Sequence, residues 1–147
     1  MSRSTEGKFV PAPYVLQPEL PPMRGLFLNA YPFWRHLHTY SAVDATTYTF
    51  DPNAVASVPL RRVIFSNGTP SLVNPVAVRR VANLHAKIFL CWRKGKLVTG
   101  FAGSWNLVTP TWLEAIAELP AAHLKTTLGW FEAIWDKADP YESTQTS

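Results

Sequence analysis

The sequence predicts a single α/β domain in which a mixed β-sheet is flanked by helices on both faces. Several short runs rich in β-branched and aromatic residues are apolar on both faces, as in a sheet that is covered on each side. A later stretch, residues 123–138, spaces its apolar residues four and three apart, which is the pattern of an amphipathic helix. With 47% apolar and 16% charged residues in a chain of 147, one domain can bury an ordinary core.

The first 24 residues lack periodicity and are rich in proline, which fixes φ and has no amide donor. We expect an extended arm over residues 1–24, the domain over residues 25–139 and a polar tail over residues 140–147. An arm near a terminus is loose by default, and the alternative is that its apolar side chains dock on a partner protein. The prolines of this arm are Pro11, Pro13, Pro18, Pro21 and Pro22.

The aromatic segment 25–40 predicts a short helix or an irregular cover over one face of the sheet. Strand-forming runs follow, and two of them are joined by the tight basic turn RKGK. Thr109 and Pro110 look like an N-cap and a first helical residue, so a helix is expected from there to about Ala117. The expected strands are residues 45–50, 60–65, 76–82, 86–92 and 97–102.

The formal charge of +4 and the pI near 9.4 favour anionic partners only mildly. The positions of the cations are more informative, because several flank the central strands and are expected to contact a nucleic-acid backbone. A solubilising rim is the alternative interpretation. These residues are Arg79, Arg80, Arg93, Lys94 and Lys96.

Cys91 is the single cysteine, which excludes an internal disulfide and argues against a cysteine-based metal site. The N-terminal residues lack the apolar run of a signal peptide, and no stretch reaches membrane-spanning length. We therefore expect a soluble, cytoplasmic protein without a membrane partner.

The stretch Asn83–Asn106 carries the chemistry. His85 and Lys87 are two residues apart, which on a strand places both side chains on one face, roughly 7 Å apart. Ser104 and Asn106 follow the next strand, and a hairpin would fold them back beside the first pair. An imidazole, an ammonium, a hydroxyl and a carboxamide gathered in this way suit a phosphate, whereas a core histidine bonded to backbone is the alternative for His85.

This pattern, His85-Ala86-Lys87 followed by Gly103-Ser104-Trp105-Asn106, resembles the HxK…GSxN signature of the phospholipase D superfamily. It is most similar to the small single-motif members, which include bacterial endonucleases. The likeness extends more weakly over residues 43–138. The resemblance implies a phospholipase D-like domain that needs neither metal nor cofactor.

Carried over by position, the resemblance implies that His85 is the nucleophile and forms a phosphohistidine. Lys87 and Asn106 would hold the non-bridging oxygens, and Ser104 would hydrogen-bond within the site. Fixed donors beside the nucleophile lower the barrier because attack builds negative charge on those oxygens.

The resemblance also implies a glutamate that orients the histidine. Glu118 is the first candidate for this role and Glu114 the second, and an ordinary solvated position is the alternative for either. Trp105, inside the second motif, would stack on a base at the mouth of the site, and packing under the following helix is the alternative.

Two features depart from the family pattern. Trp92 stands where the family commonly has an aspartate. The second HxK, His123-Leu124-Lys125, falls in the predicted helix, where residues two apart point in different directions. With one usable motif, a working site implies a homodimer in which two copies of His85 meet.

The function expected from the sequence is a metal-independent phosphodiesterase that acts on DNA or RNA. The alternative is a catalytically inactive phospholipase D-like fold that binds nucleic acid or protein as an adaptor or inhibitor. A lipid phosphodiesterase is less consistent with a single motif and no membrane-seeking segment.

Overall fold

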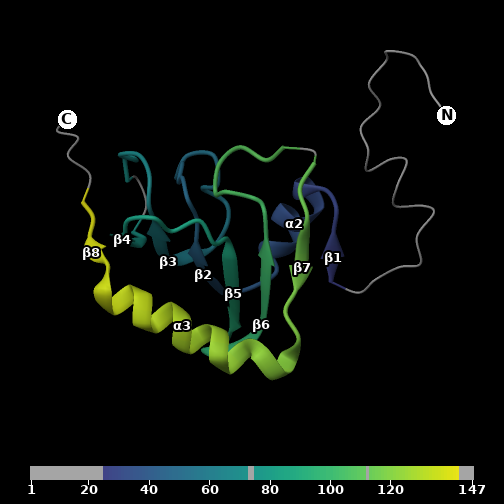
Figure 1. The fold of residues 1–147 in the computed structure, drawn as a ribbon. Coiled ribbons are helices and arrows are strands. Elements are labelled where there is room, and N and C mark those ends of the chain that lie inside the picture. Colours follow the sequence, from purple (N-terminus) through teal and green to yellow (C-terminus); the bar gives the residue numbers. More distant parts are fainter. Residues whose placement is uncertain (1–24, 73–74, 112, 143–147) are drawn as a thin grey trace, which may run out of the picture.

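The computed structural model describes residues 25–72, 75–111 and 113–142, and the expected arm and residues 143–147 of the expected tail lie outside this part. One sheet organises the described chain (Figure 1). In chain order the elements are β1 (Leu26–Phe27), α2 (Ala30–Leu37), β2 (Ala42–Thr46), β3 (Leu60–Phe65), β4 (Ala77–Arg80), β5 (Ile88–Arg93), β6 (Lys96–Gly103), β7 (Ile116–Glu118), a 3₁₀ turn (Ala121–His123), α3 (Leu124–Lys137) and β8 (Asp139–Pro140).

The sheet is mixed, as predicted, and its eight strands have the order β1-β7-β6-β5-β2-β3-β4-β8. β2, β3 and β4 run parallel to one another. The other neighbours are antiparallel, including the central pair of β2 and β5. Helix α3 carries the chain from the β7 side of the sheet to β8 at the far edge (Figure 1).

Two hydrophobic clusters form the core, and alternate residues of the same strand enter different clusters. On β3, Val63 and Phe65 belong to one cluster, whereas Ile64 belongs to the other. Phe33 of α2 lies in the first, here named the α2 cluster, and Phe131 of α3 lies in the second, the α3 cluster. The described part contains more strands than predicted, and its α-helices are α2 and α3.

The predicted β5–β6 hairpin is present, and its turn has the geometry that its length requires. Arg93 pairs with Lys96 across the ladder, so Lys94 and Gly95 alone make the turn. Both have positive φ, 52° and 76°, which is the condition for a two-residue type I′ turn between twisted antiparallel strands.

Two expected elements are wrong. The first strand is Ala42–Thr46 and not residues 45–50, because pairing with β3 and β5 ends at Thr46 and Ala45. The helix expected from Thr109 does not form. The chain there turns back and adds the short strand β7 to the sheet beside β6.

Gly103 is the reason that β7 can approach β6 so closely. A Cβ at this position would lie 2.4 Å from the Ala115 carbonyl oxygen and 2.7 Å from the Ile116 Cα. The glycine therefore permits the pairing of Gly103 with Ile116, and this tertiary contact overrides the local signals for a helix.

Residues 139–141 are attached to the β4 side of the sheet. β8 pairs with β4, and the Tyr141 backbone N–H donates to the Val78 carbonyl at 3.0 Å. The Tyr141 hydroxyl donates to the Pro70 carbonyl at 2.6 Å. None of the helices in the described ranges is long and apolar enough to cross a membrane.

An ion network centred on the buried Asp44 links the sheet to α3. Asp44 is fully buried on the side of β2 opposite the α2 cluster, and it accepts hydrogen bonds from Arg61 at 2.5 Å and Arg62 at 2.7 Å. Arg62 also bonds Glu132 of α3 at 2.9 Å, and the Trp92 indole N–H donates to Asp44 at 3.1 Å. Burial alone would raise the pKa of Asp44, but the two arginines outweigh it and the pKa lies below its ordinary value.

Replacing Asp44 by alanine should lower the free energy of unfolding by about 3–5 kcal/mol, because it leaves two arginines without their buried partner. Glu132→Gln, at a half-exposed position on α3, is the matched control and should cost less than about 1 kcal/mol. Urea unfolding measures both. A loss at Asp44 no larger than at Glu132 would contradict the assignment.

The pH dependence of the free energy of unfolding tests the same ion network independently. Because folding lowers the pKa of Asp44, its contribution is complete above the unfolded pKa of 3.8 and is lost as pH falls through the lower folded value. The Asp44→Asn variant should lack this component of the acid transition when unfolding is measured against pH.

Candidate functional site

The segments that carry the expected site residues meet at one end of the strands, where β2 and β6 end and β5 begins. Ala45 near the end of β2 pairs with Phe89 near the start of β5, and Ile88 pairs with Ala102 near the end of β6. Residues 47–49, 84–87 and 104–106 therefore leave or enter the sheet at the same edge, which is uppermost in Figure 1. We call this the site edge.

His85 and Lys87 precede β5, so the expectation that they lie on the strand itself is wrong. The chain nevertheless alternates as a strand does. Leu84, Ala86 and Ile88 all belong to the α3 cluster, and His85 and Lys87 therefore alternate to the other side of the chain. His85 and Lys87 therefore share one side of the chain, as predicted from their spacing, although they make no strand pairing of their own.

Thr46, the last residue of β2, fixes the segment that carries His85 and Lys87. Its buried hydroxyl donates to the Ala86 carbonyl at 2.8 Å and accepts from the Ile88 N–H at 3.0 Å. One side chain thus replaces the backbone ladder where β2 ends.

Thr47, also buried, does the same for the segment around Asn106. Its hydroxyl oxygen lies 2.7 Å from the Thr49 carbonyl and 3.2 Å from Asn106 Oδ1, and it accepts from the Leu107 N–H at 2.9 Å. Two adjacent threonines therefore hold both halves of the site to one strand end.

The carboxamide of Asn106 has a fixed orientation. Its Oδ1 accepts from the Tyr48 N–H at 2.9 Å and from the Thr49 N–H at 3.4 Å. Since a backbone N–H can only donate, the oxygen must occupy this end of the group. The NH₂ group is then the opposite end, which is a donor and suits an anionic oxygen.

His85 is exposed, and its ring stacks on the ring of Tyr48 with centroids 4.5 Å apart and planes 13° apart. The alternative of a core histidine is therefore wrong. Tyr48 links the two halves of the site, because its ring contacts His85 while its backbone N–H holds Asn106.

Of the two candidate glutamates, Glu114 contacts the expected site. The Ser104 hydroxyl donates to Glu114 Oε1 at 2.5 Å and accepts from the Ala115 N–H at 3.1 Å. Glu118 lies on β7, where its carboxylate accepts a 2.5 Å hydrogen bond from Thr99. The sequence interpretation ranked these two in the opposite order.

Trp105 does not serve as a stacking platform. It is fully buried, stacks on Phe89 with centroids 5.9 Å apart, and donates its indole N–H to the Val108 carbonyl at 3.2 Å. A ring without exposed surface cannot stack on a base, so the packing alternative is correct.

The expected basic residues divide into three groups. Arg93, Lys94 and Lys96 lie at the turn of the β5–β6 hairpin, which is the end of the sheet opposite the site edge. β5 has six residues, so roughly 17 Å separates its ends at about 3.3 Å per residue. These three cations therefore lie at the ends of the central strands, as expected, but the hairpin carries them away from His85.

Arg79 is occupied by α3, where it donates to the Trp135 carbonyl at 2.6 Å and lies 4.3 Å from the Trp135 ring. Arg80 is exposed at the site edge and donates to the Ser66 carbonyl at 3.2 Å. Ser66 in turn accepts the Leu84 N–H at 3.4 Å, so Arg80 is tied to the segment that leads into His85. Ser66, Arg80, Asn83 and Lys137 line a shallow depression here together with Val81, Ala82 and Asp139.

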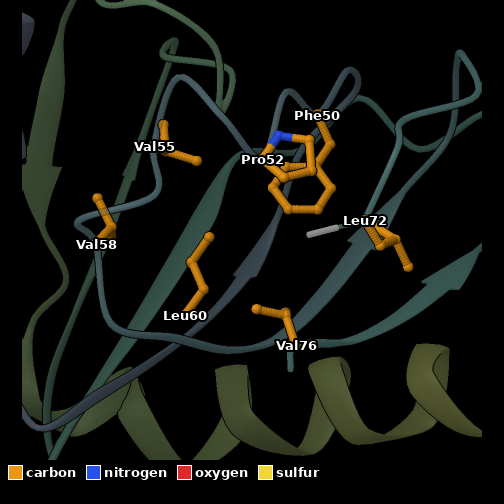
Figure 2. Close-up of a pocket in the computed structure, with 7 residues that line it drawn as sticks. All are labelled: Phe50, Pro52, Val55, Val58, Leu60, Leu72 and Val76. Carbon is orange, nitrogen blue, oxygen red and sulfur yellow. The ribbon is translucent and has the colours of Figure 1, made fainter. Parts of the chain in front are cut away.

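A separate pocket is lined by apolar side chains and offers no reactive group. Figure 2 shows seven apolar side chains around it: Phe50, Pro52, Val55, Val58, Leu60, Leu72 and Val76. None of these carries a nucleophile or a titratable group. Among the described residues, no cluster of three or more His, Cys, Asp or Glu side chains is placed to hold a metal ion.

The sequence interpretation missed Thr46, Thr47 and Tyr48, which it treated as part of a plain strand. The available signal was the pair of adjacent threonines between apolar residues, since a buried hydroxyl must find a partner. Glu114 was recognised, but only as the second candidate.

No family model matches the sequence, and no curated protein matches it either. The solved structure of Nuc from Salmonella typhimurium, a phospholipase D family member, is similar with a TM-score of 0.56 at 14% identity, covering 81% of this chain and 96% of that one. The chain has a phospholipase D-like fold. The solved structure of TrmBL2, an archaeal chromatin protein that binds DNA in a novel mode, also matches. Its TM-score is 0.49 at 9% identity, and the match covers 87% of this chain and 57% of the TrmBL2 chain. This second likeness is too weak to support an argument.

Replacing Thr47 by valine should lower the free energy of unfolding by about 1–3 kcal/mol, because it leaves the buried Leu107 N–H without its acceptor. Thr47→Ser keeps the hydroxyl and should restore most of the loss. Thermal or urea unfolding compares the two. Equal losses for valine and serine would show that the methyl group, and not the hydroxyl, holds the segment.

Proposed function

We propose that this protein is a metal-independent phosphodiesterase that cleaves nucleic acid, with His85 as the nucleophile. The observation that carries the proposal is the meeting of the His85–Lys87 and Ser104–Asn106 segments at one sheet edge, tied there by Thr46 and Thr47. The phospholipase D-like fold, shared with a phospholipase D family member, supports the same chemistry.

The reaction would proceed in two displacements. A neutral ring nitrogen of His85 attacks phosphorus, the bond from phosphorus to the leaving oxygen breaks, and a second imidazole donates a proton to that oxygen. Water then attacks the phosphohistidine, gives its proton to the second imidazole and releases His85. Imidazole suits both roles because its ordinary pKa lies near neutrality.

Charge on the non-bridging oxygens would be stabilised by Lys87 and by the NH₂ end of Asn106. The Asn106 carboxamide is already oriented by Tyr48 and Thr49 through its oxygen, so little reorganisation is needed when charge develops. Tyr48 would position His85 through the stacked rings.

Glu114 is the better candidate for the supporting carboxylate. It is connected to the site through Ser104, whereas Glu118 bonds Thr99 on β6. In this proposal Glu114 is a positioning residue, which acts through Ser104.

The second imidazole must come from another copy of the chain. His123 lies at the junction of the 3₁₀ turn and α3, and no geometry of the described residues places it with His85. A homodimer in which the two site edges face each other would supply His85 twice. This arrangement explains why one HxK segment is sufficient.

The first test is hydrolysis of labelled DNA and RNA in the presence of EDTA. Activity should persist in the chelator and fall to background in His85→Ala. Lys87→Ala or Asn106→Ala should each lower kcat by about 10²–10³-fold, the usual cost of removing one donor to a developing anion. Glu118→Gln should have little effect, and Glu114→Gln should lower kcat without changing unfolding midpoints.

The alternative function, binding without catalysis, gives a different result in the same assays. Nucleic acid would be retained by the wild type and by His85→Ala with equal affinity, and neither would cleave it. Activity that disappears in EDTA and returns with a divalent cation would contradict the proposed mechanism.

The dimer makes a separate prediction. Specific activity should fall on dilution below the dimer dissociation constant, because each site needs two copies of His85. Mixing wild-type chains with an excess of His85→Ala chains should lower the activity of the wild type, because a mixed dimer holds only one copy of His85. A strictly monomeric protein with full activity at high dilution would exclude the shared site.

A further inference from the structure

The turn of the β5–β6 hairpin carries three exposed cations that the proposed chemistry does not use. Arg93 and Lys96 end the two strands as a pair, and Lys94 occupies the turn between them. We name Arg93, Lys94 and Lys96 the hairpin cations. They lie at the end of the sheet opposite the site edge.

Lys94 is an unusual residue for its backbone conformation. Its φ of 52° lies in the left-handed region, which the first position of a type I′ turn requires. Asparagine, aspartate or glycine suits this position better, because other side chains crowd the backbone there. A charged side chain is therefore present where local stability favours a different residue, and such conflicts concentrate at functional positions.

Neighbouring polar and aromatic groups contact the Arg93 side chain and the Lys94 backbone without neutralising the positive charge. Arg93 donates to the carbonyl and hydroxyl of Thr39, each at 3.3 Å, and its guanidinium lies 4.5 Å from the Tyr40 ring. The Lys94 N–H donates to the Ser41 hydroxyl at 3.3 Å. These contacts go to neutral partners, so the positive charge is kept.

Three carboxylates of the sheet and α3 are paired with other groups. Asp44 bonds Arg61 and Arg62, and Glu132 bonds Arg62. Glu118 accepts from Thr99. In the part of the chain that the structure describes, the salt bridges involve none of the hairpin cations.

We propose that the hairpin cations form a second contact surface for the nucleic-acid backbone, separate from the phosphate that reacts at His85. This inference rests on the proposed function, from which it takes nucleic acid as the polymer. At roughly 17 Å from the start of β5, estimated at about 3.3 Å per residue, the surface meets a different part of the strand from the part that is cleaved. A polyanion that crosses the protein would contact both ends of the hairpin.

The chemistry of the turn favours phosphodiesters over a lipid surface. Interfacial membrane binding needs apolar or aromatic side chains that insert between headgroups, and the turn consists of Lys94 and Gly95. The guanidinium of Arg93 offers a planar fork that matches phosphate oxygens. Anionic vesicles are therefore the competing partner in the test.

The experiment measures binding of a short labelled DNA duplex and of an RNA duplex as a function of salt, in a His85→Ala background that leaves the polymer intact. The triple variant Arg93→Gln, Lys94→Asn, Lys96→Gln should make the slope of log K against log salt shallower by about two to three, at about 0.9 per phosphate contact. Lys125→Gln, an exposed cation on α3, is the control and should leave the slope unchanged.

Folding and catalysis are read separately. Lys94→Asn alone should lower affinity while leaving the unfolding midpoint unchanged or higher, because asparagine accepts the positive φ. In the His85-containing protein, the triple variant should hydrolyse bis(p-nitrophenyl) phosphate at the wild-type rate, since this small diester cannot span the two surfaces.

Unchanged affinity and salt slope in the triple variant would overturn the inference. Binding of the wild type to phosphatidylserine vesicles, without binding to either duplex, would also overturn it. Failure of the proposed function is distinguishable, because it would show as no hydrolysis of polymer or small diester while the binding assay remains informative.

Discussion

The site edge depends on two adjacent threonine hydroxyls at the end of β2. Thr46 holds the segment before β5, and Thr47 holds the segment after β6. Both side chains are buried, so each hydroxyl must be satisfied within the protein. These hydrogen bonds make the relative position of His85 and Asn106 a consequence of strand packing, although their segments are separate in sequence.

Much of the fold could be predicted from the sequence because its signals were local. The run Leu60–Phe65 became β3 with the expected bounds, and the apolar spacing after His123 became α3. The segment after Asn106 could not be predicted in this way. Thr109 and Pro110 favour a helix locally, whereas the decisive feature is the missing side chain of Gly103, which admits a neighbouring strand.

The candidate site was partly predictable for the same reason. The types and spacing of His85, Lys87, Ser104 and Asn106 indicated phosphate chemistry. The supporting residues come from the end of β2 and the two residues after it, about forty to sixty positions away. The basic residues show the converse error. Arg93 and Lys96 are close to the motif in sequence, and a strand then carries them to the other end of the sheet.

Trp92, which stands where the phospholipase D family commonly has an aspartate, lies far from the proposed reaction site. Trp92 lies near the hairpin end of β5, where its indole donates to Asp44 and its ring lies 4.7 Å from the Arg61 guanidinium. The carboxylate of this region is therefore supplied by Asp44 on the neighbouring strand. The His85 end of β5 is built from other contacts, so the tryptophan by itself is no argument against a working site.

In the two proposals, the two ends of β5 carry positive charge for different purposes. At physiological salt the Debye length is about 8 Å, so cations roughly 17 Å away have little influence on the charge that develops at a phosphate beside His85. They do act on a polymer long enough to reach both ends. Affinity for a long substrate and the rate of bond cleavage are therefore separable under these proposals, and a small diester reports only on the second.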